Sequence, residues 1–328
     1  MCELSVVVPV YRCESCLRSL HERLTQTLGR ITSDYELVFV DDRSPDDGWT
    51  TLQRLASIDP HVKAVRLSRN FGQHPAITAG LAESAGRWVV VMDCDLQDPP
   101  EEIPRLYDAA KAGYEIVFAR RKTRRHSLFR RASAAAYTKL MNLFLGTTIE
   151  GEYGAFSIIS RKVVTEFLGL QDRDRHYLLI LSWLGFSQTS IDVDHGERHS
   201  GQSAYSFASL VRHALDGVFF QTTTLLRWIV YTGLALALLG FGLALELVIA
   251  YVFGAEPPSG YTSVSVLILL STGFILTSLG VTGLYLGKVF EQVKARPLYI
   301  IDERIGGRGV GSAEIGALDP GAPGSHLL

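Results

Sequence analysis

The sequence is poor in cysteine, with four in 328 residues: Cys2, Cys13, Cys16 and Cys94. Cys13 and Cys16 have the spacing of half a zinc site, but the chain has no second pair to complete it. Nothing in the sequence around them resembles a thioredoxin-like unit. We interpret the cysteines as reduced, structural thiols of a cytosolic domain.

The chain also lacks a large excess of charge of either sign. Its formal net charge is −2, which argues against a protein-wide role in binding nucleic acid, because no basic excess neutralises phosphates. No signal peptide is expected, since the apolar stretch Leu4–Val10 is too short and contains Pro9. We expect this stretch to be the first strand.

Short β-rich runs alternate with amphipathic stretches over residues 4–118. The predicted strands are Leu4–Val8, Glu36–Val40, Lys63–Leu67, Trp88–Met92 and Glu115–Ala119. The predicted helices are Glu14–Leu28, Gly48–Ser57, Pro75–Ala85 and Pro100–Ala112. This alternation is typical of βαβ units, and we predict an α/β domain with a mostly parallel sheet in residues 1–203.

Two long apolar runs come later, Leu225–Phe253 and Val264–Val289, with a polar, proline-containing break at 254–260. Each run exceeds the roughly 20 residues that cross a bilayer. A buried core helix is the alternative, but two adjacent runs of this length rarely occur in a soluble domain. We predict a transmembrane hairpin in residues 225–290, with helices at about 226–253 and 263–289.

Basic residues flank the predicted hairpin on its outer sides. Arg212 and Arg227 precede it, Lys288, Lys294 and Arg296 end or follow it, and the connecting loop has no Lys or Arg. Because cytoplasmic flanks are enriched in Lys and Arg, we expect a multi-pass protein of the cell membrane with the α/β domain and both termini in the cytoplasm.

Residues 204–224 are predicted to form an amphipathic helix in the membrane interface. Apolar residues recur there at helical spacing: Phe207, Leu210, Val211, Ala214, Leu215, Val218 and Phe219. Packing of this helix against the α/β domain is an equally good explanation. We expect a cytoplasmic extension at 291–305 and a disordered tail, rich in Gly, Ala and Pro, at 306–328.

The run Trp88–Met92 is followed by two aspartates, Asp93 and Asp95. Ligands of parallel α/β sheets bind at the carboxyl ends of strands, and two carboxylates there repel each other unless a cation lies between them. Mg²⁺ favours one or two carboxylates plus substrate phosphates, so the pair indicates a metal that carries a nucleotide diphosphate. A turn is the alternative, because Asp98-Pro99-Pro100 is turn chemistry.

Polar segments follow the other strands too. Asp41 and Asp42 could accept hydrogen bonds from a nucleobase or ribose, and an Asp-rich turn that caps the next helix is about as good an explanation. The exit Val8–Tyr11 could form a flat wall for a base, although a plain strand end is more common. The loop Ser68–His74 suits sugar or phosphate contacts, with His74 itself more often structural.

Seven basic residues occur in a stretch without acids: Arg120, Arg121, Lys122, Arg124, Arg125, Arg130 and Arg131. Such a cluster could bind RNA or direct nuclear import. Beside a membrane hairpin, anionic lipid headgroups are better partners, and the guanidinium fork suits a diphosphate or lipid phosphate. A merely solvated loop is the alternative for several of them.

Taken in order, several motifs resemble the family 2 glycosyltransferases of GT-A fold. The motifs are Val7–Tyr11, Val40–Asp46, Arg69–His74, Met92–Glu101, Glu197–Ser206 and Lys294–Tyr299. More narrowly, they resemble the polyprenyl-phosphate group, which includes dolichol-phosphate mannose synthases and bacterial prenyl-phosphate glucosyltransferases and aminoarabinose transferases. The resemblance covers nearly everything except the tail.

The resemblance implies roles for the matching residues. The implied nucleotide and donor ligands are Pro9, Tyr11, Glu14, Asp41, Asp42, Asn70, Gly72, Asp93 and Arg121. The implied ligands of Mg²⁺ or Mn²⁺ are Asp93, Asp95 and Gln97. The lipid phosphate is assigned Arg131, Arg198, Ser203 and Tyr205, and catalysis is assigned Asp95, Glu152 and Arg198.

Two motifs depart from the family pattern. Ala155 and Ser157 stand where the family often has Asp and Arg, and Ala204 stands where it has Lys. These departures imply a different sugar pocket or acceptor geometry, or impaired activity.

The implied function is inverting, metal-dependent transfer of one sugar from a nucleotide-sugar, with a UDP-sugar favoured, to undecaprenyl or a related polyprenyl phosphate. The product would be a sugar donor for the cell envelope. A processive polysaccharide synthase is disfavoured, because Gln221 is too far from Arg227 to form its Gln-x-x-Arg-Trp motif. A degenerate membrane-anchored scaffold is the other alternative. Similar proteins often form tetramers, but these residues do not fix the oligomer.

Overall fold

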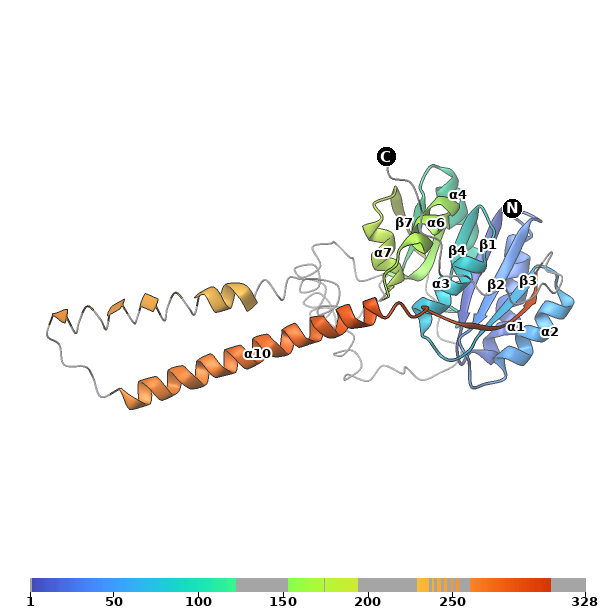
Figure 1. Cartoon of the computed structure of the whole chain (residues 1–328). Coiled ribbons are helices and arrows are strands. Elements are labelled where there is room, and N and C mark those ends of the chain that lie inside the picture. The colour runs from blue at the N-terminus through green and yellow to red at the C-terminus, as the bar shows by residue number, and fades with distance from the viewer. Residues whose placement is uncertain are drawn as a thin grey trace, which may run out of the picture.

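The computed structural model describes residues 2–121, 153–173, 175–193 and 229–307, the last range with short gaps between residues 236 and 259. It consists of an α/β domain from which a long helix extends (Figure 1). The predicted amphipathic helix at 204–224 lies outside the described residues, as does the predicted tail beyond Gly307.

An eight-stranded sheet forms the centre of the domain, in the order β7-β5-β6-β4-β1-β2-β3-β8. The strands are β1 Leu4–Val10, β2 Tyr35–Asp41, β3 Val62–Leu67, β4 Trp88–Val91, β5 Ile116–Arg121, β6 Tyr153–Ser160, β7 Gln188–Val193 and β8 Ile301–Gly306. The β1–β2, β1–β4, β2–β3 and β5–β7 pairs are parallel, and the β4–β6, β5–β6 and β3–β8 pairs are antiparallel. The predicted α/β class with a mostly parallel sheet is confirmed.

Helices cover both faces of the sheet. Their bounds are α1 Glu14–Leu28, α2 Gly48–Ile58, α3 Gln73–Glu83, the short 3₁₀ helix η1 Pro100–Glu102, α4 Ile103–Lys111, α6 Arg161–Gly169 and α7 Tyr177–Trp183. Successive residues of a strand point to opposite faces. In β1, Val6 packs with Leu20 of α1 in one core cluster, and Val7 packs with Ile77 of α3 in the other.

The strand β8 comes from the segment that the sequence predicted to be a cytoplasmic extension. It pairs antiparallel with β3 and is the sheet's edge strand. The predicted start of the tail, Gly306, is its last residue, with a φ of 76°. A side chain there would overlap the carbonyl oxygen of Val62, so glycine is required. The α/β domain therefore uses residues from both ends of the chain.

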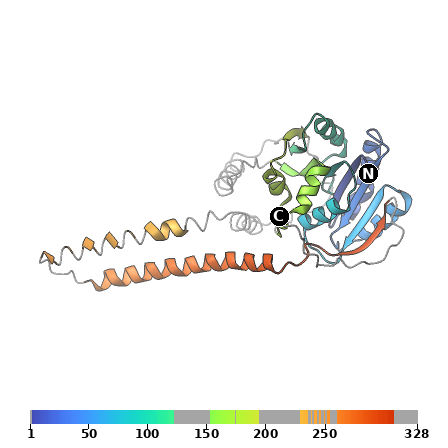
Figure 2. The same cartoon turned by 45° about the horizontal axis from the view of Figure 1, so that its top comes forward.

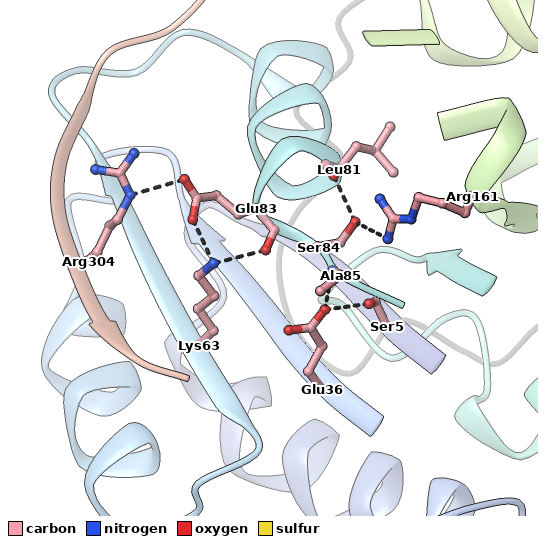
Figure 3. A network of polar contacts seen from close by, with 9 residues as sticks. All are labelled: Ser5, Glu36, Lys63, Leu81, Glu83, Ser84, Ala85, Arg161 and Arg304. Atoms are coloured by element: carbon pink, nitrogen blue, oxygen red, sulfur yellow. Dashed lines mark hydrogen bonds and ion pairs between the residues drawn. The ribbon is translucent and has the colours of Figure 1, made fainter. Parts of the chain in front are cut away.

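An ion-pair network holds β8 against the sheet (Figure 3). The Glu83 carboxylate, at the end of α3, lies 2.7 Å from Nζ of Lys63 in β3 and 3.0 Å from Nε of Arg304 in β8. Burial alone would raise the pKa of Glu83, but the two cations lower it overall. The carboxylate therefore joins β3, β8 and α3.

The helix α10 spans Tyr261–Val293, and its section Ser271–Val293 is long and apolar enough to cross a membrane. Among the described residues it is the one helix that meets this test. Helical residues at 229–235 belong to the other predicted span and lie beside α10 in both Figure 1 and Figure 2. A Cβ at Gly233 would lie 3.0 Å from the Phe274 ring, so the two segments approach closely.

The end of α10 contacts the α/β domain between α6 and α7. The Gln292 side-chain amide donates to the carbonyl oxygen of Gln171 over 2.9 Å, and its oxygen accepts from the backbone N–H of Arg173 over 3.3 Å. Seven residues after α10, the carbonyl of Ile300 accepts from the backbone N–H of Ser68 over 2.9 Å. The apolar helix is thus joined to the loop that follows β3.

Candidate functional site

The carboxyl ends of β1, β2, β3 and β4 meet at one edge of the sheet. Ligands of parallel α/β sheets bind at such an edge. The backbone N–H of Asp42 donates to Val10 over 3.0 Å and that of Met92 donates to Val7 over 3.1 Å, which holds the strand exits in register. The polar segments that the sequence singled out after these four strands are therefore neighbours.

Asp42 anchors the loop that follows β3. Its two carboxylate oxygens accept the backbone N–H groups of Phe71 and Gly72 over 2.7 and 2.8 Å. The side chain is buried, and burial raises its pKa against the opposing effect of these amides and of Arg69. Asp42 therefore shapes the predicted donor site by fixing this loop, in which Asn70 is exposed.

Asp41, the last residue of β2, stabilises the turn that follows this strand. It is fully buried, and one oxygen accepts the backbone N–H of Ser44 over 3.1 Å. The other lies 3.3 Å from Nε of Arg66, an ion pair without hydrogen-bond alignment. Burial raises the pKa of Asp41 more than these partners lower it. Its direct contact with a donor stays a prediction.

The turn after β2 is tied to the start of α1. Asp46 accepts from the Ser44 hydroxyl and from the backbone N–H of Glu14, the latter over 3.1 Å. These bonds, against burial, lower the pKa of Asp46. The Glu14 carboxylate itself accepts from the Thr51 hydroxyl over 3.2 Å and so links α1 to α2.

Two further predicted donor residues lie at the exit of β1. Pro9 is buried within the strand and pairs with Val40. Tyr11 follows the strand and is 42% exposed, with the Arg12 guanidinium 5.4 Å from the centre of its ring. The Tyr11 ring is therefore accessible at the edge where the four strands end.

The aspartates after β4, Asp93 and Asp95, are half-buried, and a hydrogen bond holds the backbone between them. Between them, the carbonyl of Cys94 accepts from the Cys13 thiol over 2.9 Å. The Cys94 side chain and burial raise the pKa of Cys13. Asp95 accepts from the backbone N–H of Gln97 over 3.1 Å. Asp93 accepts from the side-chain amide of Gln73 over 2.7 Å.

These oxygen groups fit a hard divalent cation. Within the described ranges, no three His, Cys, Asp or Glu side chains form a set able to hold a metal. The loop after β4 offers the two carboxylates of Asp93 and Asp95, and Mg²⁺ binds through one or two carboxylates plus substrate phosphates. These two carboxylate ligands therefore suit a cation that is bound together with a diphosphate.

The contact between the partly buried His74 and His176 was not predicted from the sequence. Nδ1 of His74 accepts the backbone N–H of Tyr177 over 3.4 Å, and the rings of His74 and His176 lie 4.4 Å apart. Burial and then His176 lower the pKa of His74 to about 4. The imidazole is neutral at pH 7 and packs against the ring of His176.

Several predicted site residues cannot be placed against this edge. Arg131, Glu152, Arg198, Ser203 and Tyr205 lie outside the described residues. The Arg121 backbone ends β5 and pairs with Val193, while its side chain is not among those described. Their assigned roles stay predictions.

Comparison with known proteins agrees with the motifs at this edge. Residues 5–168 match the family model "Glycosyl transferase family 2". An uncharacterized glycosyltransferase of Bacillus subtilis is 34% identical over 305 residues, 93% of this chain and 94% of that protein. An uncharacterized glycosyltransferase of Synechocystis is 36% identical over 303 residues, 92% of this chain and 95% of that protein.

A relative with a named activity matches over nearly the same length. The undecaprenyl-phosphate 4-deoxy-4-formamido-L-arabinose transferase of Proteus mirabilis is 35% identical over 308 residues, 93% of this chain and 94% of that protein. The chain therefore belongs to glycosyl transferase family 2, and it is a glycosyltransferase.

Proposed function

We propose that this chain transfers a single sugar from a nucleotide-sugar to undecaprenyl phosphate or a related polyprenyl phosphate, at the cytoplasmic face of the membrane. One observation carries the proposal. The edge that holds Asp93 and Asp95 is joined through Ile300 and Ser68 to an apolar helix of membrane-spanning length. A relative that covers nearly the whole chain is named for a transfer to undecaprenyl phosphate.

The donor is assigned to the edge where the parallel strands end. Tyr11 offers an exposed aromatic face for the base, and the loop fixed by Asp42 follows β3 at the same edge of the sheet. Asp93 and Asp95, with Gln97 as a further candidate, would hold Mg²⁺ or Mn²⁺ on the diphosphate. The cation would stabilise the negative charge of the leaving diphosphate.

The acceptor is assigned to the membrane side of the domain. An oxygen of the lipid phosphate would attack the anomeric carbon as the bond to the nucleoside diphosphate breaks, and this single displacement inverts the anomeric centre. The acceptor oxygen is already anionic at neutral pH, so alignment of the two reactants contributes more than a strong base. Arg131, Arg198, Ser203 and Tyr205 are the proposed phosphate ligands, and Glu152 and Arg198 are proposed to orient the reactants.

The membrane arrangement supports this assignment of the acceptor. We infer that 226–253 and α10 cross the bilayer as a hairpin, with the α/β domain at the cytoplasmic ends. Basic residues on the outer flanks and none in the connecting loop favour this orientation. The amphipathic segment 204–224 is proposed to lie in the interface, beside the path of the lipid phosphate.

A donor screen tests the proposal. The full-length chain in detergent is incubated with radiolabelled undecaprenyl phosphate and each of a set of UDP- and GDP-sugars, with Mn²⁺ or with EDTA. Transfer of one sugar to the lipid, lost in EDTA, is the expected result, with a UDP-sugar as donor. A product that grows by repeated addition would indicate a processive synthase instead. Failure with every donor would count against transfer to this lipid.

A further inference from the structure

Gln73 is the first residue of α3, and its side chain reaches a carboxylate of the proposed metal site. Nε2 of Gln73 donates to Oδ1 of Asp93 over 2.7 Å. The amide is neutral, so it orients the carboxylate without adding charge that would compete with or repel a cation. We propose that Gln73 is the positioning residue that sets the affinity of Asp93 for a divalent cation, an inference that rests on the proposed function.

The backbone immediately before Gln73 is fixed by Asp42, the aspartate that follows β2. Asp42 accepts the N–H groups of Phe71 and Gly72, so both residues that precede Gln73 are held. Gly72 adopts a φ of 99°, which directs the chain from the loop into α3. Residues with a side chain rarely adopt this backbone angle. The position of Gln73 is therefore set by Asp42.

The residue after Gln73 is fixed as well. His74 is packed against His176, with ring centres 4.4 Å apart, and accepts the backbone N–H of Tyr177. The first turn of α3 is thus anchored in front of Gln73 and behind it. The Gln73 side chain is itself exposed, and the anchored backbone on either side of it keeps it within reach of Asp93.

The two aspartates of the metal site are oriented in different ways. Asp95 accepts a backbone N–H from its own turn, that of Gln97. Asp93 instead accepts from a side chain that is 20 residues away in the chain. Partners that orient a ligand typically change metal affinity or activity by about 10- to 100-fold when removed. Metal affinity is therefore expected to depend on the side chain of Gln73, through Asp93.

The test measures the cation itself. Mn²⁺ binding to the full-length chain in detergent, with UDP present to supply the diphosphate and without lipid, is followed by electron paramagnetic resonance for wild type, Gln73→Met and Gln73→Ala. Methionine keeps the length of the side chain and its helix propensity but cannot donate. We expect roughly tenfold weaker Mn²⁺ binding in both variants, with thermal unfolding midpoints close to wild type. The matched control is Gln26→Met, on the exposed surface of α1, which should leave Mn²⁺ binding unchanged.

Asp95→Ala separates this inference from the proposed function. If Gln73→Met binds Mn²⁺ like wild type while Asp95→Ala does not bind it, the positioning role is wrong and the metal site stands. If the wild-type chain binds no Mn²⁺ and transfers sugar in EDTA, both the positioning role and the metal-dependent function are wrong. Weaker binding in Gln73→Met, with Gln26→Met unchanged, supports the inference.

Discussion

The hydroxyl groups of Ser157 and Tyr177 lie 2.9 Å apart in the interior behind the candidate site. Ser157 belongs to β6, Tyr177 begins α7, and both are buried. Ser157 stands where the resembled family often has arginine. The Tyr177 ring packs edge-on against Phe167. The serine that departs from the family pattern is therefore paired with a buried tyrosine.

Removal of either hydroxyl should have unequal effects on stability. Ser157→Ala leaves the buried Tyr177 hydroxyl without its partner, at a cost of about 1–3 kcal/mol, whereas Tyr177→Phe removes one hydrogen bond for about 1 kcal/mol. In the phenylalanine variant Ser157 still donates to the carbonyl of Ala155, over 3.0 Å. Thermal unfolding of the chain in detergent measures the difference.

Ser182→Ala is the control for the Ser157 comparison. Ser182 lies in the same short helix as Tyr177, and its hydroxyl bonds only the carbonyl one turn earlier. Its unfolding midpoint should stay within a degree or so of wild type, since changes away from buried networks are usually within about 0.5 kcal/mol. A Ser157→Ala variant as stable as wild type would show that the buried pair contributes nothing.

Asp95→Ala should abolish transfer in the presence of Mn²⁺ or Mg²⁺. Without that carboxylate, the proposed metal site retains only Asp93 as a carboxylate ligand for a cation that must offset the charge of a leaving diphosphate. Initial rates with the best donor give the measurement. A loss of at least about 100-fold is expected, because removal of a residue that only orients a metal ligand already costs about 10- to 100-fold. Asp108→Asn, on the exposed side of α4, is the control. Wild-type rates in Asp95→Ala would remove these residues from the metal site.

The repeated βαβ part of the fold was predictable because its signals are local. Val6, Val7 and Val8 form a continuous buried run, as both faces of a parallel strand are covered. Leu17, Leu20 and Leu24 recur at helical spacing. The strands β6, β7 and β8 gave weaker signals. In particular, β8 is an edge strand with three charged residues in its middle, Asp302, Glu303 and Arg304, and no apolar run marks it.

The candidate site was predictable only in part, for a similar reason. Asp42 and Asp93 follow strands, so their position at one sheet edge could be inferred from the sequence. Their connection through Gly72 and Gln73 could not, because it depends on a backbone turn with positive φ and on the direction of one side chain. The pairing of His74 with His176, which lies just before α7, likewise depends on tertiary packing.

Gly72→Ala should weaken donor binding more than it weakens the fold. A φ of 99° with a ψ of 166° costs a residue with a side chain about 1–3 kcal/mol, although space around the position is open. The strain would be relieved by movement of the loop away from Asp42. A several-fold rise in the KM for the nucleotide-sugar, with kcat less affected, is expected from steady-state rates. Gly113→Ala, also at positive φ but after α4, serves as the control for strain alone.

Stability should fall as the pH is lowered from about 6.5 towards 4, in part through His74. Its pKa in the folded protein is about 4, against an ordinary value of 6.5, because burial and His176 disfavour the charged form. Between these values the unfolded chain binds more protons, so stability rises with pH there and is fully present above 6.5. The shift corresponds to a contribution on the order of 3 kcal/mol.

Thermal unfolding at pH 7.5 and pH 5.0 should show a smaller difference in His74→Leu than in wild type. His61→Leu, near the amino end of β3, provides the comparison at a histidine away from the site. Equal pH dependence in wild type and His74→Leu would mean that His74 does not carry this effect.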